Sequence, residues 1–255
     1  MDIDQFLNKE FKDGDDLIVV DHLKKAFGSN VVLKDINLKV KKSQNLVVLG
    51  KSGIGKSVLI KCIVGLYSIT AGRAFVLDEE VSTLEEDEIN TLRKRIGYLF
   101  QGGALYDSMT VRENLAFPVR RTLFSKQPDE VEAMVVDVLK SVGLESSIDK
   151  VPSELSGGMK KRVGLARTLI LKPDIILYDE PTTGLDPVTG QEISELMLSI
   201  KDEYDTTSIT ITHDMKCARM TANHIMVLRD GVVSAQGSYD ELSQSDDEEI
   251  RAYFT

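Results

Sequence analysis

The chain is poor in cysteine and has no excess of basic residues. Cys62 and Cys217 are its only cysteines among 255 residues, and each stands inside a segment that we expect to be helical. We interpret both as buried, reduced thiols of a cytosolic protein. Lys and Arg total 31 against 41 Asp and Glu, which gives a net charge of −10. This balance argues against a nucleic-acid-binding protein, because such proteins depend on basic patches.

Long hydrophobic runs are also missing. The N-terminus, Met1-Asp2-Ile3-Asp4-Gln5, is acidic and does not contain the apolar core of a signal peptide. No apolar run approaches the roughly 20 residues that a membrane-spanning helix needs. We therefore expect a soluble chain. Its length allows one large α/β domain, or a domain with a subdomain, with a full hydrophobic core.

What the sequence does contain is an alternation of short apolar runs with amphipathic segments. The expected strands are 17–21, 31–40, 45–49, 73–77, 96–100, 174–178, 207–212, 224–228 and 232–236. The expected helices are 55–65, 86–94, 111–117, 129–142, 157–171, 190–204 and 215–221. We expect proline at or beside helix ends, because helix interiors disfavour it; the residues concerned are Pro118, Pro128, Pro152 and Pro173. The alternation predicts an α/β fold with a mainly parallel sheet covered by helices on both faces.

These segments suggest one domain over residues 1–255 with an inserted part. Residues 17–100 and 172–243 form the expected α/β core. Residues 101–171 are mostly helical in pattern and form an expected helical subdomain. Residues 1–16 are expected to be a solvated acidic arm, and residues 244–255 are an acidic tail to which the pattern assigns no role.

The segment Gly50-Lys51-Ser52-Gly53-Ile54-Gly55-Lys56-Ser57 matches the phosphate-loop pattern G-x-x-x-x-G-K-[ST]. A strand is expected before it and a helix after it, which is the context that the pattern needs. Its glycines allow backbone N–H groups to surround phosphate oxygens at a helix N-terminus. We expect Lys56 to reach the β- and γ-phosphates of ATP and the Ser57 hydroxyl to bind Mg²⁺, with Val58 completing the segment. A plain glycine turn is the alternative, which this context disfavours.

Two adjacent carboxylates follow the apolar run 175–178. Neighbouring side chains of a strand point to opposite faces, but at the end of the strand Asp179 and Glu180 can both turn toward a nucleotide. In phosphoryl transfer such an Asp holds Mg²⁺, usually through water, and a second acid orients or deprotonates the attacking water. The alternative is a solvated acidic pair, which the phosphate loop upstream disfavours.

A second potential anion site lies at Ser156-Gly157-Gly158, where a helix is expected to begin. A serine cap followed by exposed backbone amides favours an anion. Because one chain has one nucleotide to bind, this second site suggests a second molecule. Leu155 precedes these residues and Lys160-Lys161-Arg162 follow them, which distinguishes them from an ordinary helix start.

The order of these three motifs resembles the ATPase subunits of ATP-binding-cassette (ABC) transporters over nearly the whole chain. The resemblance implies a P-loop NTPase fold, with an antiparallel β subdomain beside the parallel sheet and the helical insert. It also implies a homodimer arranged head to tail around two ATP. In that dimer Ser156, Gly157 and Gly158 of each chain close over the ATP of the other. Asp186 matches the loop that crosses the dimer interface.

Three further roles come from the resemblance alone. Gln101 would contact both the metal and the attacking water, His213 would contact the γ-phosphate, and Phe27 would stack on adenine. Each residue has an ordinary alternative: a surface-loop glutamine, a core or loop histidine, and a core phenylalanine. His22 and His224 are interpreted as ordinary structural residues.

The signature motif departs from the general family at its last position, where Met159 replaces the commoner Gln. With Met159, the stretches 101–115 and 155–162 are similar to the ATPase subunits of bacterial Mla/Mce-type lipid transporters. This resemblance implies an integral membrane permease and a periplasmic or envelope lipid-binding protein as partners. It places the chain, as a peripheral protein, at the cytoplasmic face of the inner membrane. The permease would dock on residues 102–115 through Leu105, Tyr106 and Met109, for which packing within the subunit is the alternative.

Two other kinds of ABC protein compete with this interpretation. An ABC ATPase that regulates an envelope or cell-division partner without transport carries the same catalytic motifs. ABC proteins of translation normally carry two cassettes, and those of repair interrupt their motifs with a coiled coil or zinc modules. One cassette, two scattered cysteines and a pI of about 4.9 disfavour both nucleic-acid types. We therefore expect no nucleic-acid partner.

Overall fold

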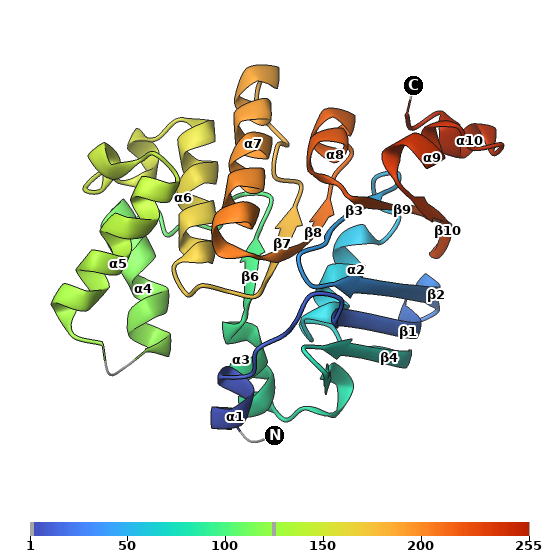
Figure 1. The fold of residues 1–255 in the computed structure, drawn as a ribbon, viewed down its shortest axis with the longest axis horizontal. Coiled ribbons are helices and arrows are strands. Elements are labelled where there is room, and N and C mark those ends of the chain that lie inside the picture. The colour runs from blue at the N-terminus through green and yellow to red at the C-terminus, as the bar shows by residue number, and fades with distance from the viewer. Residues whose placement is uncertain (1–2, 124–125, 255) are drawn as a thin grey trace.

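The computed structural model describes residues 3–123 and 126–254 (Figure 1). Met1, Asp2 and Thr255, which belong to the predicted arm and tail, lie outside the described residues. In the described part of the chain, no helix combines the length and the apolar character that crossing a membrane requires.

The strands of the described residues form one 10-stranded sheet, in the order β5-β4-β1-β2-β10-β9-β3-β8-β7-β6. From β9 through β3, β8 and β7 to β6, each strand is parallel to the next, whereas β10 pairs antiparallel with β9. At the other end, β5, β4, β1 and β2 pair antiparallel. The predicted α/β fold with a parallel core and an antiparallel β part is confirmed. The bounds are β1 Asp16–Phe27, β2 Asn30–Lys41, β3 Asn45–Leu49, β4 Ala71–Val76, β5 Glu79–Glu80, β6 Ile96–Leu99, β7 Ile175–Asp179, β8 Thr207–Ile211, β9 His224–Arg229 and β10 Val232–Gly237.

Helices cover both faces of the parallel strands. The longer helices are α2 Lys56–Ile63, α3 Glu86–Lys94, α4 Val111–Thr122, α5 Pro128–Ser141, α6 Gly157–Leu169 and α7 Pro187–Tyr204. The shorter ones are α1 Ile3–Leu7, α8 Met215–Thr221, α9 Tyr239–Ser243 and α10 Glu248–Arg251. In Figure 1, α4, α5 and α6 stand side by side, away from the antiparallel strands β1, β2 and β4.

Strand β7 shows how the two faces are filled. Ile175 and Leu177 pack in the apolar cluster that includes α2 and the antiparallel strands. Ile176 and Tyr178 pack in a second cluster, which is formed with α4 to α7. Successive side chains of a strand point to opposite faces, so a strand that is covered on both sides needs an unbroken apolar run. This double burial fixes the end of β7, where Asp179 stands.

Pro118 corrects one expectation, because it lies inside α4 rather than beside a helix end. The helix continues to Thr122, five residues beyond the predicted end at Phe117. Leu115 and Val119, on either side of the proline, are both fully buried in the same cluster. Burying this face stabilises the helix more than the backbone hydrogen bond lost at proline destabilises it.

The predicted arm and tail each contain a buried apolar anchor. Phe6 in α1 is 3% exposed, and its carbonyl oxygen accepts a hydrogen bond of 2.6 Å from the Arg95 guanidinium. The prediction of a solvated arm over residues 1–16 is therefore wrong at Phe6. In the tail, Ile250 of α10 is buried against α8 and α9. Acidic neighbours concealed both residues, because a single apolar side chain produces no periodic pattern.

The two cysteines behave as expected. Cys62 in α2 and Cys217 in α8 are free and buried. Burial raises the pKa of each thiol to about 11, so neither is a reactive thiolate near neutral pH.

Candidate nucleotide-binding site

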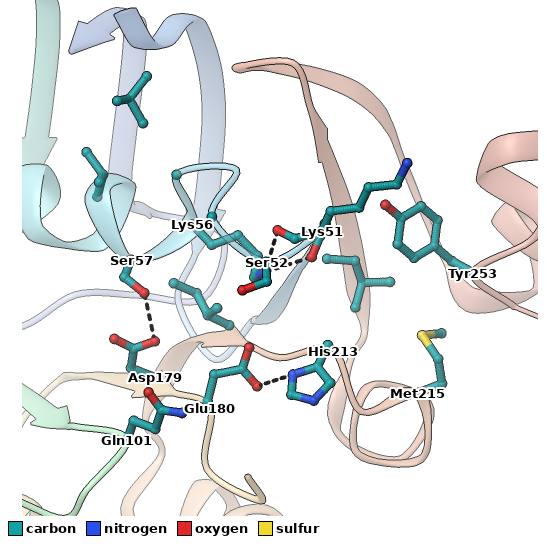
Figure 2. A pocket seen from close by; sticks show the side chains of 17 residues that line it. Lys51, Ser52, Lys56, Ser57, Gln101, Asp179, Glu180, His213, Met215 and Tyr253 are labelled. Carbon is teal, nitrogen blue, oxygen red and sulfur yellow. Dashed lines mark hydrogen bonds and ion pairs between the residues drawn. The ribbon is translucent and has the colours of Figure 1, made fainter. Parts of the chain in front are cut away.

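A pocket of about 720 Å³ opens where β3, β7 and β8 end (Figure 2). This volume is within the range of small-molecule sites, and the carboxyl ends of parallel strands are where such sites form. The predicted site residues that line the pocket are Gly50, Lys51, Ser52, Gly53, Gly55, Lys56, Ser57, Val58, Gln101, Asp179, Glu180 and His213. Ile54 belongs to the same loop but packs against the core cluster.

The phosphate loop joins the buried strand β3 to α2. Gly55 is the N-cap of α2 with φ of 110°, a left-handed conformation that side chains other than glycine rarely adopt. A Cβ atom added there would lie 2.8 Å from Cγ1 of Val32. Gly55 contributes no side-chain cap, so the first N–H groups of α2 can bind an anion.

Lys56 turns its ammonium group back onto this loop. Its Nζ atom donates to the carbonyl oxygens of Gly50 at 2.7 Å and Lys51 at 3.2 Å (Figure 2). The residue is only 7% exposed. Burial lowers the pKa of Lys56 from its ordinary value, and the charges of Glu180 and Asp179 partly oppose this effect. A desolvated cation on the pocket wall is suited to bind phosphate oxygens.

Ser57 and Asp179 lie side by side in the pocket and are hydrogen-bonded (Figure 2). Ser57 Oγ donates to Asp179 Oδ1 at 3.0 Å, and the phenol of Tyr98 donates to Asp179 Oδ2 at 3.1 Å. Burial first, and then the Asp179 charge, raise the pKa of Tyr98, so its phenol keeps the proton that it donates. A hydroxyl beside a carboxylate provides the oxygen ligands that Mg²⁺ prefers.

No group of three or more His, Cys, Asp or Glu side chains within residues 3–123 and 126–254 could hold a metal by itself. A Mg²⁺ ion at Ser57 and Asp179 would therefore take further oxygens from phosphate and water, as is usual for this ion. The hydroxyl and carboxylate present fit such a partial ligand set.

Glu180 and His213 form a pair at the ends of β7 and β8. His213 Nδ1 and Glu180 Oε2 are 2.8 Å apart (Figure 2). The Thr183 hydroxyl donates to the same oxygen at 3.1 Å. Glu180 has φ of 52°, an unusual backbone conformation for a residue other than glycine. Strained conformations of this kind often occur at functional sites. The turn directs both carboxylates, Asp179 and Glu180, toward the pocket.

Gln101 follows the end of β6, and its side chain lines the pocket. Its amide lies beside Asp179 and Glu180 in Figure 2. Behind it, the ammonium group of Lys161 in α6 donates to the carbonyl oxygens of Gln101 and Glu180, the latter at 3.2 Å. The sequence singled out Lys161 only as part of the signature motif and did not predict this contact.

The signature residues are not among those that line this pocket. Ser156 is the exposed N-cap of α6, and its Oγ accepts from the Met159 backbone N–H at 3.2 Å. Gly157 and Gly158 follow in the first turn of α6. Asp186 caps α7, and hydrogen bonds from the hydroxyl and N–H of Thr189 hold the pKa of its carboxyl below the ordinary value.

Phe27 also stands outside the pocket lining. Its ring is 43% exposed, packs edge-on against Tyr67 with centroids 5.4 Å apart, and lies 4.6 Å from Lys25 Nζ. Its proposed stacking on adenine stays a prediction. Tyr253, from the tail, does line the pocket. The aromatic pair Tyr253-Phe254 near the acidic terminus was the one sequence signal that could have found it.

Comparisons with known proteins identify relatives that are named as ATP-binding proteins of transporters. The ABC transporter family model matches residues 33–183. The methionine import ATP-binding protein MetN of Campylobacter jejuni is 37% identical, over 89% of this chain and 72% of that protein. The probable ribonucleotide transport ATP-binding protein mkl of Mycobacterium leprae is 37% identical, over 92% and 68%. The intermembrane phospholipid transport system ATP-binding protein MlaF of Haemophilus influenzae is 36% identical, over 91% and 87%.

A solved structure gives the same result for the fold. The chain superposes with a TM-score of 0.78 on the ATP-binding cassette MJ0796, in a dimeric post-hydrolysis state bound to ADP and Pi. The two are 31% identical, and the match covers 87% of this chain and 98% of that one. The phosphate loop, the paired carboxylates and the signature motif all lie within the residues that the family model matches. The chain therefore belongs to the ABC transporter family, as the ATP-hydrolysing domain of a transporter.

Proposed function

We propose that two copies of the chain bind two ATP with Mg²⁺ in a head-to-tail dimer and that hydrolysis drives a permease for phospholipid or another lipid. The observation that carries the nucleotide chemistry is the cluster of Lys56, Ser57, Asp179 and Glu180 around one pocket. Met159 in the signature motif and the likeness to MlaF support the lipid cargo.

Within the pocket each group has a separate task. Ser57 and Asp179 would hold Mg²⁺, which when bound neutralises charge on the β- and γ-phosphates. Lys56 adds a second positive charge to those oxygens. Because its present acceptors are carbonyls of the loop itself, the ammonium group can exchange them for phosphate with little movement.

Glu180 is the group that orients the attacking water and accepts its proton. His213 and Thr183 both contact Oε2, which holds the carboxylate in place and leaves Oε1 as the oxygen that we assign to the water. The Gln101 amide lies beside Asp179 and Glu180 (Figure 2), where it can contact the same water and the metal.

The dimer follows from the position of the second helix N-terminus. Ser156 is exposed, and the pocket of its own chain is lined by other residues. The backbone amides after Ser156 are therefore available to the nucleotide of a second copy. That the similar cassette MJ0796 forms a dimer in a nucleotide-bound state supports this arrangement.

The names of the relatives do not agree on a cargo. Relatives of nearly equal identity are named for methionine import, ribonucleotide transport and phospholipid transport. We favour lipid because Met159 occupies the position at which the Mla/Mce type departs from the general signature. A permease docked on residues 102–115 would hold the chain as a peripheral protein at the cytoplasmic face of the inner membrane. An envelope lipid-binding protein would complete the complex.

A direct test is to purify the chain with its permease and to extract the bound small molecules for mass spectrometry. A lipid enriched over an unrelated membrane protein prepared in the same way, together with ATP-dependent transfer of that lipid between vesicles, is expected. Hydrolysis that methionine or a ribonucleotide stimulates, without any lipid enrichment, would contradict the lipid cargo. Hydrolysis without transfer of any of these would favour the regulatory alternative.

A further inference from the structure

One face of α6 contacts residues 101–106, which follow β6. Lys161, Gly164 and Arg167 are spaced by three residues and so lie on the same side of the helix. Lys161 donates to the carbonyl oxygen of Gln101, and Arg167 to that of Ala104. The Arg167 guanidinium also lies 5.0 Å from the centre of the Tyr106 ring.

Gly164 allows this approach, since a Cβ atom there would lie 2.9 Å from Leu99 Cδ1 and 3.3 Å from Gly103 Cα. Helix α6 and the segment 101–106 are thus in backbone contact. In this close packing a small shift of one displaces the other, because a densely packed contact leaves no void to absorb it.

Lys161 differs from the other two residues in reaching a second loop. Its Nζ atom also lies 3.2 Å from the carbonyl oxygen of Glu180. The side chain is 6% exposed, and its two acceptors here are backbone carbonyls. Burying an ammonium group costs free energy unless the group is hydrogen-bonded. Moving either carbonyl away from Lys161 would remove a hydrogen bond from the buried charge, so Lys161 holds both carbonyls in place. Lys161 does not line the pocket, so it acts through Gln101 and Glu180 rather than on the nucleotide.

We propose that Lys161 is a positioning residue that ties the signature helix α6 to Gln101 and Glu180 of the same chain. Lys161 stands little more than one helical turn from Ser156. Contact of Ser156 with the nucleotide of the partner then sets the orientation of Gln101 and Glu180 in the chain's own pocket. In the dimer this connection couples the two hydrolysis sites. The inference rests on the proposed head-to-tail dimer.

The test compares Lys161→Met and Lys161→Arg in the full chain with ATP and Mg²⁺. Met keeps the length of the side chain but leaves the two carbonyls without their donor, whereas Arg restores a charged donor. For Lys161→Met we expect kcat to fall roughly 10–100-fold, the range seen when a group that orients a reacting group is removed. Equilibrium ATP binding should stay near wild type. The Hill coefficient of hydrolysis against ATP should fall toward one, and Lys161→Arg should recover most of both losses.

Arg95→Met is the matched control. Arg95 is 8% exposed and likewise donates to two backbone carbonyls, those of Phe6 at 2.6 Å and Lys9 at 2.8 Å, but it does not line the pocket. It should lower the melting temperature at least as much as Lys161→Met does, without changing kcat or the Hill coefficient. Wild-type kcat in Lys161→Met would overturn the inference, and so would a loss of kcat that Arg95→Met reproduces. If the wild type itself shows no ATP-dependent dimer, the proposed function fails instead.

Discussion

Helices α2 and α6 begin alike and differ in what their N-termini face. Each starts at glycines, and each carries a buried lysine whose ammonium group donates to two backbone carbonyls. Burial lowers the pKa of both lysines, and Glu180 and Asp179 oppose that shift in both. The N-terminus of α2 opens on the pocket of its own chain, whereas Ser156 at the start of α6 is exposed.

The same chemistry therefore serves two purposes. Lys56 lines the pocket and bonds to carbonyls of its own glycine-rich loop, so a phosphate can replace them. Lys161 lies outside the pocket and connects the loops that follow β6 and β7. Its removal would therefore disturb the positions of Gln101 and Glu180. Position relative to the pocket, and not residue type or burial, separates a ligand-binding lysine from a positioning lysine.

The largest effect is expected for Lys56→Ala, which removes the ligand-binding member of this pair. ATP binding and hydrolysis should be abolished, because the loop loses its desolvated cation facing the β- and γ-phosphates. Equilibrium binding of a fluorescent ATP analogue and phosphate release measure the two losses. Lys61→Ala, one turn later in α2, is the control and should bind as wild type does. Normal binding by Lys56→Ala would remove the distinction between Lys56 and Lys161.

Glu180→Gln removes one of the negative charges that oppose the lowering of the pKa in both Lys56 and Lys161, and it also tests Glu180 as the catalytic base. The amide keeps the shape of the side chain without its basicity, so ATP should still bind while kcat falls about 10²–10⁴-fold. Single-turnover hydrolysis separates this loss from product release. A kcat within a factor of about three of wild type would show that Glu180 is not the base.

The double substitution Tyr106→Ala and Met109→Ala tests residues 102–115, the segment on which we expect the permease to dock. Tyr106 is exposed, although its ring also packs edge-on against Phe117 with centroids 5.1 Å apart. Binding of the permease should weaken on the order of tenfold, as for other interface aromatics, and ATP affinity should not change because neither residue lines the pocket. Co-purification with the permease and nucleotide titration give the two values. Unchanged complex formation would assign both side chains to packing within the subunit.

The smallest effect is expected for Tyr98→Phe. This change removes the hydrogen bond to Asp179 Oδ2 and keeps the ring that stacks on Phe100 with centroids 4.1 Å apart. A hydrogen bond to a charged group contributes roughly 1.5–3 kcal/mol. Because this bond is already present without Mg²⁺, only the difference between the free and the metal-bound state changes the affinity, so the Mg²⁺ concentration for half-maximal hydrolysis should rise a few-fold. Phe100→Leu, which loses stacking but keeps the hydrogen bond, is the control. No change in Mg²⁺ dependence in Tyr98→Phe would mean that Asp179 needs no such support.

The sequence predicted well the features that are local in the chain. The phosphate loop and the Asp179-Glu180 pair are contiguous motifs at strand ends, and the structure brings them to one pocket. Contacts between distant segments were not predictable, because no spacing rule links Lys161 to Gln101 or Tyr253 to the phosphate loop. Strand β1 illustrates a third case. The expected strand ends at Asp21, whereas β1 continues to Phe27. The next residue, His22, has φ of 49° and lies at a bulge, which interrupts the alternation of buried and exposed side chains.

The exposed start of α6 is the feature on which the dimer depends, and sedimentation velocity tests it most directly. Glu180→Gln, which should hold ATP without hydrolysing it, is predicted to be a monomer or a weak dimer alone and a stable dimer with ATP and Mg²⁺. Adding Ser156→Arg should keep the chain monomeric while its ATP affinity stays near that of Glu180→Gln, because Ser156 is outside its own pocket. An ATP-dependent dimer of the double variant would contradict the account, and so would ATP binding as weak as that of Lys56→Ala.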